Sequence, residues 1–303
     1  MLTRWMAVLA AGAIAAGGAF WLLSAPHPAV AEADAASFEG GDPEKGRLLF
    51  AAADCASCHA TPGQTDRLHL GGGMALASPF GTLYVPNISP HPMDGIGKWR
   101  GVDLANALLA GISPRGQHYY PAFPYTSFTH INRSDVRDLM AYLRTLQPVA
   151  NQTPPHDLPF PLSIRRFVGL WKLLYFDRTP IAPDATREPA WNRGRYLVEG
   201  PTHCAECHSS RNFAGAIKES TRFAGGKDPE GVGFVPNITP AAIGAWSTED
   251  LVRIMTDGHT PEGREVGSSM NDVVVDTRML PDDDRRAIAT YIKSLPPRPT
   301  PKP

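Results

Sequence analysis

The pattern Cys-x-x-Cys-His occurs twice in this chain of 303 residues, as CASCH and CAECH, and the two copies use all four cysteines. Two thiols three positions apart, followed at once by an imidazole, form the attachment pattern of c-type haem. On the first turn of a helix the thiols can reach the vinyl groups of the porphyrin, and the histidine points at the iron from the same face. The pattern predicts two covalently bound haem c groups. The predicted cofactor-binding residues are Cys55, Cys58, His59, Cys204, Cys207 and His208, and the two histidines are predicted iron ligands.

Different uses of paired cysteines fit less well. A zinc knuckle would come with a ββα pattern and a redox-active thiol pair with a βαβ context, and neither pattern surrounds these motifs. A structural disulfide could form in an exported chain, but two copies of the whole pattern, each with its histidine, favour haem.

The two motifs belong to a longer internal repeat. KGRLLFAAADCASCH at 45–59 matches RGRYLVEGPTHCAECH at 193–208 with one residue inserted. A glycine cluster, the sequence YVPNISP or FVPNITP, a tryptophan and two amphipathic helical patterns then follow in the same order in each half. A repeat of about 150 residues is too long for a solenoid unit, so it indicates two tandem copies of one domain.

Each copy is expected to have one helix that runs before and through its motif and that crosses the last helix of the copy. Gly46 and Tyr142 mark the crossing helices of the first copy, and Gly194 and Tyr291 those of the second. Glycine at the same place in both copies predicts close helix contact. The first amphipathic helix after each motif should end in a left-handed glycine cap, at Gly111 in the first copy and at Gly258 in the second.

Several segments besides the motifs make the chain similar to a known family. They are GRYLVEGPTHCAECHSSRN, FVPNITP, the SMNDVV segment, DDRRAIATYIKSLPP, HYYPAFPYTSF and SPFGTLYVPNISP. Over about residues 40–297 the chain resembles the multihaem cytochrome c subunits of membrane-bound bacterial alcohol, aldehyde and sugar-acid dehydrogenases. The best-known members carry three haems, whereas this chain has two motifs.

The expected fold is mainly α, with two tandem cytochrome c domains at 40–150 and 186–298, long irregular loops and an N-terminal membrane helix. The predicted signal or membrane anchor is 1–31. Its uncharged run from Trp5 to Leu23 is long enough to cross a bilayer, which favours a retained anchor, although Ala29-Val30-Ala31 offers a cleavage site. The later residues are then expected at the periplasmic face of the bacterial inner membrane.

The segment between the two domains, 151–185, is predicted to be a packed linker. It is proline-rich at both ends, with an apolar and basic stretch from Arg165 to Phe176. This stretch holds too much apolar surface to leave in water, which predicts packing across both domains. A helix that lies on a membrane surface is the alternative.

The sixth iron ligand is expected to differ between the copies. In such domains it is usually a methionine before the last helix, and a thioether raises the redox potential. Met270 stands there in the second copy, whereas Met255 falls inside a helix and Met279 at the entrance of the last one. The equivalent position in the first copy is Phe123, which cannot bind iron. The first haem could instead take His118, His130, Met74, the weaker choice Met93, or no protein ligand.

These features predict an electron carrier. The chain would pass electrons from a periplasmic or membrane dehydrogenase towards quinone or a terminal cytochrome oxidase, with the membrane as a further partner. A haem enzyme of peroxidase-like or thiosulfate-oxidising type, with the first haem as its catalytic centre, is the alternative, and Phe123 is its main support. The formal net charge of -1 gives no field strong enough to recruit nucleic acid or an anionic membrane surface.

Overall fold

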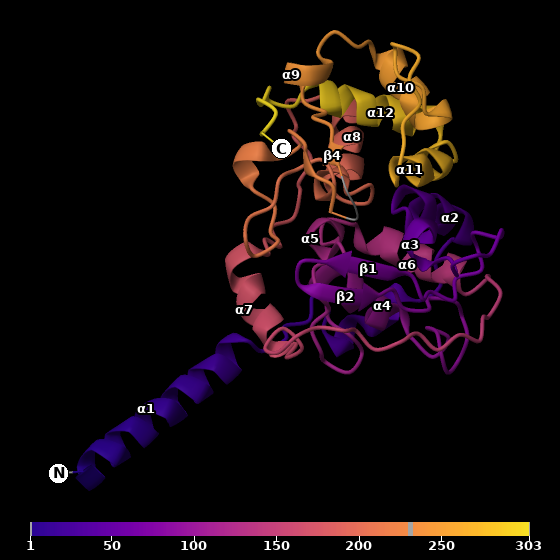
Figure 1. Cartoon of the computed structure of the whole chain (residues 1–303). Coiled ribbons are helices and arrows are strands. Elements are labelled where there is room, and N and C mark those ends of the chain that lie inside the picture. The colour runs from indigo at the N-terminus through magenta and orange to yellow at the C-terminus, as the bar shows by residue number, and fades with distance from the viewer. Residues whose placement is uncertain (1, 230–232, 303) are drawn as a thin grey trace.

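Helix α1 (Leu2–Leu23) projects from the body of the molecule, which is formed by the two halves of the chain (Figure 1). This is a computed structural model, and it describes residues 2–229 and 233–302. The described part is mainly helical, with little strand. Within it, α1 is the one helix that is long and apolar enough to cross a membrane, over Arg4–Leu23.

The first half is built around helices α2 and α6, which pack against each other. Asp42 caps α2, since its carboxylate accepts a hydrogen bond from the backbone N–H of Glu44 at 2.9 Å. A short antiparallel hairpin lies between the haem motif and the later helices. The elements are η1 (Glu32–Phe38), α2 (Pro43–Ala52), α3 (Cys55–His59), β1 (Ala75–Ser78), β2 (Gly81–Tyr84), α4 (Gly101–Ala110), α5 (Tyr125–Phe128) and α6 (Arg133–Leu143).

The second half follows the same plan, with helix α8 packed against α12. Its hairpin is shorter and pairs Gly226 with Val235. The elements are α8 (Pro189–Glu199), η2 (Cys204–Glu206), η3 (Glu219–Thr221), β3 (Gly226–Lys227), β4 (Phe234–Val235), α9 (Pro240–Ile243), α10 (Thr248–Asp257), α11 (Met270–Thr277) and α12 (Asp282–Lys293).

The predicted close crossing of the first and last helices is confirmed in both halves. A Cβ atom on Gly46 would lie 2.0 Å from the carbonyl oxygen of Asp138, and one on Gly194 would lie 1.9 Å from that of Ala287. Both distances are far below van der Waals contact, so only glycine fits at either crossing. The left-handed caps are also found, because Gly111 has φ 60° and Gly258 has φ 78°.

Two clusters of buried apolar side chains form the cores, one centred on each helix pair. The second cluster also includes Ala51 and Ala52 at the end of α2. Helix α2 therefore packs into the first core on one side and against the second half on the other. This contact brings the two halves together next to the first haem motif.

The expectation that one helix runs through each motif is wrong, because α2 ends at Ala52 and α8 at Glu199. The residue directly before each first cysteine has left-handed backbone, with φ 48° at Asp54 and φ 36° at His203. A right-handed helix cannot include such a residue, so each motif begins a separate short helical turn.

Helix α7 (Arg166–Tyr175) touches both halves. Lys172 donates through Nζ to the carbonyl oxygens of Ala110 and Gly111 at 2.7 and 2.9 Å, and Trp171 donates through Nε1 to the carbonyl oxygen of Ala214 at 2.9 Å. Leu174 of this helix is nevertheless 74% exposed.

Candidate haem-binding sites

The histidine of each motif is held by a proline carbonyl. The Nδ1 atom of His59 lies 2.8 Å from the carbonyl oxygen of Pro86, and that of His208 lies 2.7 Å from the carbonyl oxygen of Pro236. A carbonyl can only accept, so Nδ1 carries the proton in both rings. Nε2 is left as the basic nitrogen, which is the form that ligates a metal.

A glycine in each half allows the proline loop to approach the histidine. The N–H of Gly72 donates to the carbonyl oxygen of His59, and that of Gly225 donates to the carbonyl oxygen of His208, both at 2.9 Å. A Cβ on Gly72 would lie 2.5 Å from the carbonyl oxygen of Pro86. Sequence reasoning missed this support, although the glycine cluster and the Val-Pro-Asn segment recur together in both halves and could have indicated it.

An asparagine fixes each proline loop to the chain after the last helix. Asn87 donates through Nδ2 to the carbonyl oxygen of Val149 at 2.7 Å, and Asn237 donates to that of Arg298 at 2.8 Å. Both asparagines are buried. The loop that orients each histidine is thereby tied to the C-terminal end of its own half.

The donor set fits haem c. The four cysteine side chains are half-buried and form no disulfide. Burial lowers the pKa of His59 to about 4 and also lowers the pKa of His208, with the proline hydrogen bond opposing it. Both imidazoles are therefore neutral, as iron ligation requires. Neutral histidines with an oriented Nε2, each beside two accessible thiols, match the needs of covalent haem attachment.

The two motifs begin side by side. His203, directly before the second motif, has Nε2 3.3 Å from the carbonyl oxygen of Ala53, which is two residues before Cys55. The His203 ring also packs on Phe128 of the first half, with ring centroids 5.4 Å apart. The cysteines that open the two motifs, Cys55 and Cys204, are therefore on facing segments of the two halves.

A buried glutamate inside the second motif strengthens this contact. Glu206 accepts hydrogen bonds from the hydroxyls of Thr126 at 2.5 Å and Ser127 at 3.2 Å, both in α5 of the first half. Arg211 donates to its other oxygen at 2.7 Å. Burial alone would raise the pKa of Glu206, but Arg211 and Thr126 outweigh it and lower the pKa. The carboxylate thus stays charged and joins the halves.

A second polar contact joins the first motif to helix α11. Burial, and then a hydrogen bond to Asp276, raise the pKa of Asp54 to about 9. Arg67 donates to both oxygens of Asp276, at 3.0 and 3.3 Å. Asp54 is therefore protonated at neutral pH and donates to the Asp276 carboxylate, which Arg67 holds in place.

The predicted second-half ligand, Met270, is the first residue of α11 and is half-buried. Met255 is buried in the second core, as its place inside a helix predicted, and Met279 is 43% exposed. The role of Met270 as the sixth ligand stays a prediction.

In the first half Phe123 is part of an aromatic cluster. Its ring lies 5.6 Å from that of Tyr119 and 5.7 Å from that of Phe128. Of the candidate sixth ligands, His118 is tied to the end of α1, because its Nε2 lies 2.9 Å from the carbonyl oxygen of Ser24. We therefore do not assign His118 to the iron.

The three remaining candidate ligands of the first haem lie in different places. His130 is half-buried and lies against Gly200, so it faces the second half. Met93 is 74% exposed, and Met74 is half-buried directly before β1. The roles of Met74 and His130 as alternative sixth ligands of the first haem stay predictions.

A mainly helical chain with two equivalent Cys-x-x-Cys-His segments, each with an oriented histidine, defines the class of c-type cytochromes. The cytochrome c family model matches residues 43–147. The chain is 48% identical over 258 residues to a "Diheme cytochrome c-type" of Cereibacter sphaeroides, a match that covers 84% of this chain and 86% of the relative. The chain therefore belongs to the cytochrome c family. The family and this relative support two covalently bound haem c groups.

Further relatives are subunits of dehydrogenases. The chain is 40% identical to the fructose dehydrogenase cytochrome subunit of Gluconobacter japonicus, over 83% of this chain and 52% of that subunit. It is 33% identical to the cytochrome c subunit of the quinone-type alcohol dehydrogenase of Gluconobacter oxydans, over 84% of this chain and 54% of that subunit. The chain thus spans about half the length of these two relatives.

Proposed function

We propose that this chain is a membrane-anchored dihaem cytochrome that carries electrons from a dehydrogenase towards quinone or a terminal oxidase. Its relatives include cytochrome subunits of fructose and alcohol dehydrogenases, which supports a dehydrogenase as the electron donor. The proposed organisation is two tandem cytochrome c domains, 40–150 and 186–298, with 151–185 as the linker and 1–31 as the anchor.

Each domain contributes covalent attachment and iron ligation. Haem c supplies reversible one-electron chemistry when it is bound. The two cysteines of each motif would hold it covalently, so it cannot be lost from an exported protein. His59 and His208 would bind iron through Nε2, and their proline contacts keep the rings in the ligating orientation. In the second domain Met270 would complete the coordination.

The observation that carries the proposal is the contact between the two motifs, where His203 meets the carbonyl oxygen of Ala53 at 3.3 Å. The cysteines that follow these residues would hold the two haem c groups on facing segments of the two halves. Because electron tunnelling slows steeply with distance, attachment sites on facing segments favour fast electron transfer within the chain.

The packing around residues 24–30 supports a retained anchor. Val30 is buried in the first core, and its backbone N–H and carbonyl both bond to the side chain of Asn106. Ser24 is also fully buried. Cleavage after Ala31 would remove both residues from the fold. We expect the purified protein to have the intact mass with α1, and to stay with the membrane on carbonate extraction; a chain that starts at Glu32 would contradict the anchor.

The electron-carrier proposal predicts little carbon monoxide binding. We would record the carbon monoxide difference spectrum of the reduced, haem-loaded full chain, because an iron with two firm protein ligands leaves no open position. Binding at about one carbon monoxide per chain would instead show an open iron, and would favour the haem enzyme that uses the first haem as its catalytic centre.

A further inference from the structure

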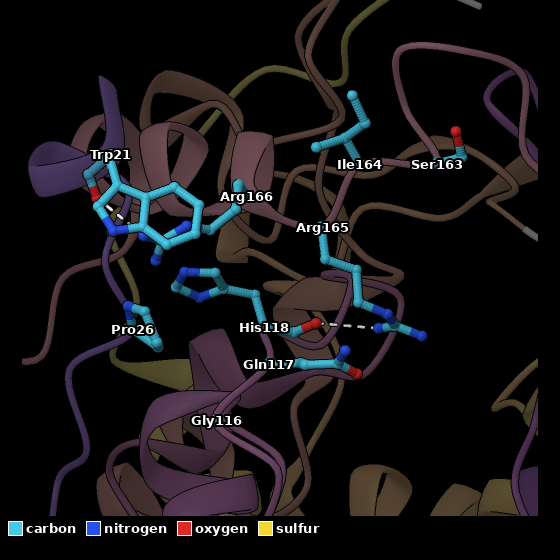
Figure 2. A pocket seen from close by; sticks show the side chains of 9 residues that line it. All are labelled: Trp21, Pro26, Gly116, Gln117, His118, Ser163, Ile164, Arg165 and Arg166. Carbon is cyan, nitrogen blue, oxygen red and sulfur yellow. Dashed lines mark hydrogen bonds between the residues drawn. The ribbon is translucent and has the colours of Figure 1, made fainter. Parts of the chain in front are cut away.

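A cavity lies where the chain leaves α1. Its volume is about 600 Å³, and it is formed by the end of α1, the 116–118 loop and the start of α7 (Figure 2). Figure 2 shows the imidazole of His118 between Trp21, Arg166 and Pro26, with Arg165 on the other side. This cavity is separate from both haem motifs in its lining residues.

The cavity contains buried polar atoms without partners. His118 is 3% exposed; its Nε2 bonds to the Ser24 carbonyl oxygen at 2.9 Å, whereas its Nδ1 has no partner among the described residues. Since a carbonyl accepts, Nε2 carries the proton and Nδ1 is an acceptor. Nε of Arg166 is also buried without a partner in the described part of the chain. Burying such groups unpaired is costly, so the site calls for a ligand with both donors and acceptors.

The charges around the cavity are positive and unpaired. Arg165, Arg166 and Arg178 all donate to backbone carbonyl oxygens, and none forms an ion pair with a described Asp or Glu. The cavity lining itself includes two arginines and, among the described residues, no acidic one. The chain as a whole is nearly neutral, but this cavity carries a local excess of positive charge, which favours binding of an anion.

The cavity is placed at the end of the membrane-spanning run. The 20 residues from Arg4 to Leu23 would extend about 30 Å as a helix, which is the thickness of the hydrocarbon core. Trp21 therefore falls in the interfacial layer, where tryptophan is enriched. The guanidinium of Arg166 lies 3.8 Å from the centroid of the Trp21 ring. The membrane-spanning helix therefore ends directly at the cavity.

Helix α7 lies across the end of α1 (Figure 1). A Cβ on Gly169 would be 2.4 Å from the carbonyl oxygen of Ser24, and the rings of Phe20 and Phe167 are 5.1 Å apart, so α7 is packed directly on this exit. Its exposed apolar residues continue into the preceding loop. They are Phe160, Ile164, Phe167, Leu173 and Leu174.

We propose that this cavity binds the headgroup of an anionic phospholipid, while α7 and the 160–164 loop lie in the interfacial layer of the bilayer. The phosphate oxygens accept hydrogen bonds from Arg165 and Arg166, and a headgroup hydroxyl donates to Nδ1 of His118. The exposed apolar side chains contact the acyl boundary. This inference rests on the proposed anchor, because α1 brings the cavity to the membrane surface.

Native mass spectrometry of the full, haem-loaded chain in detergent tests the proposal, with phosphatidylglycerol and phosphatidylcholine added separately. We expect one phosphatidylglycerol to be retained per chain in preference to phosphatidylcholine. Arg165→Gln should weaken its binding by at least about tenfold, because a hydrogen bond to a charged group is lost. Arg165→Lys should restore part of the affinity, and the charge control Arg253→Gln, at an exposed side chain of α10, should leave it unchanged.

Equal retention of the two lipids, or phosphatidylglycerol binding unchanged in both Arg165→Gln and Arg166→Gln, would overturn the proposal. A bound quinone identified by its mass in place of the lipid would also overturn it. The haem absorbance spectrum and the thermal unfolding midpoint of each variant show that it is folded. If the chain shows no lipid selectivity but resists carbonate extraction, only the lipid-binding inference is wrong. If carbonate releases the chain from the membrane, the proposed anchor is wrong as well.

Discussion

At the scale of single residues, the site is defined by which atoms of each histidine are already engaged. Nδ1 of His59 and of His208 is occupied by a proline carbonyl, so Nε2 is the nitrogen left for iron. This orientation is the same in both halves, so the proposed difference between the haems rests on the sixth ligand. Met270 is the predicted ligand in the second half, whereas the equivalent position in the first half is Phe123, which lies in an aromatic cluster.

Removing the Met270 thioether should therefore change one haem only. We expect Met270→Ala to lower the potential of one haem by on the order of 0.1 V, because the ligand that favours ferrous iron is lost. The variant should also gain carbon monoxide binding at one haem per chain. A redox titration with a carbon monoxide difference spectrum measures both. Met279→Ala, on a nearby half-exposed methionine, is the control, and equal behaviour of the two variants would exclude Met270 as the ligand.

The motif residues could be predicted from the sequence because covalent haem attachment needs a fixed local spacing. The proline contacts of the histidines were not predicted, since Pro86 is 27 residues from His59 and the contact depends on the path of the loop; the Val-Pro-Asn segment that recurs in both halves was a signal for them. The hydrogen bond of His118 to the end of α1 could not be predicted either. This bond to Ser24 joins residues 94 apart, and a histidine close to the expected ligand loop gives no local sign of such a partner.

At the scale of secondary-structure elements, each half depends on one close helix crossing. Helix α2 meets α6 at Gly46, and α8 meets α12 at Gly194. The repeat and the helical periodicity made these pairs predictable. The left-handed residue at Asp54 was not, because it is not a glycine and nothing in its local sequence requires a break in the helix. Before His203, in contrast, Gly200-Pro201 does mark the end of α8.

A side chain at either crossing should separate the helices. Gly194→Ala would place Cβ 1.9 Å from the Ala287 carbonyl oxygen, and relief of this clash should cost about 1–3 kcal/mol of unfolding free energy. Thermal unfolding of the haem-loaded protein should show a lower midpoint. Gly267→Ala adds the same methyl group where no atom lies within 4 Å, so it should leave the midpoint unchanged. A midpoint for Gly194→Ala equal to that of this control would disprove the close crossing.

At the scale of the whole molecule, the halves are joined by polar contacts made beside the two motifs. Asp54, Asp276 and Arg67 link the first motif to α11, while Glu206 links the second motif to α5. Any change in the arrangement of the halves would break a buried hydrogen bond. This makes a fixed relation between the haems part of the fold, and the sequence pattern of two separate domains could not reveal it.

The acid pair at this contact predicts how stability depends on pH. The pKa of Asp54 is raised in the folded state to about 9 by burial and by Asp276, so folding favours the protonated form. Its contribution is therefore fully present below about pH 4 and is lost progressively as the pH rises towards 9, at no more than about 1.4 kcal/mol per pH unit. The variant Asp54→Asn keeps a hydrogen-bond donor at this position but has no group that ionises.

Urea unfolding of the haem-loaded protein at about pH 5 and about pH 8 measures this effect. The free energy of unfolding should fall less between the two pH values in Asp54→Asn than in the unaltered chain. Asp66→Asn, at an exposed acid in the same half, should keep the original dependence. A slope unchanged by Asp54→Asn would mean that Asp54 is ionised in the folded protein.

Pulse radiolysis of the full, haem-loaded chain would decide whether electrons pass between two haems inside one molecule. A pulse that delivers less than one electron per molecule would first reduce either haem, and the absorbance would then report redistribution between them. We predict a first-order redistribution whose rate does not change with protein concentration. A redistribution rate that rises in proportion to protein concentration would show that electrons move only between molecules, and would contradict the proposed transfer within the chain.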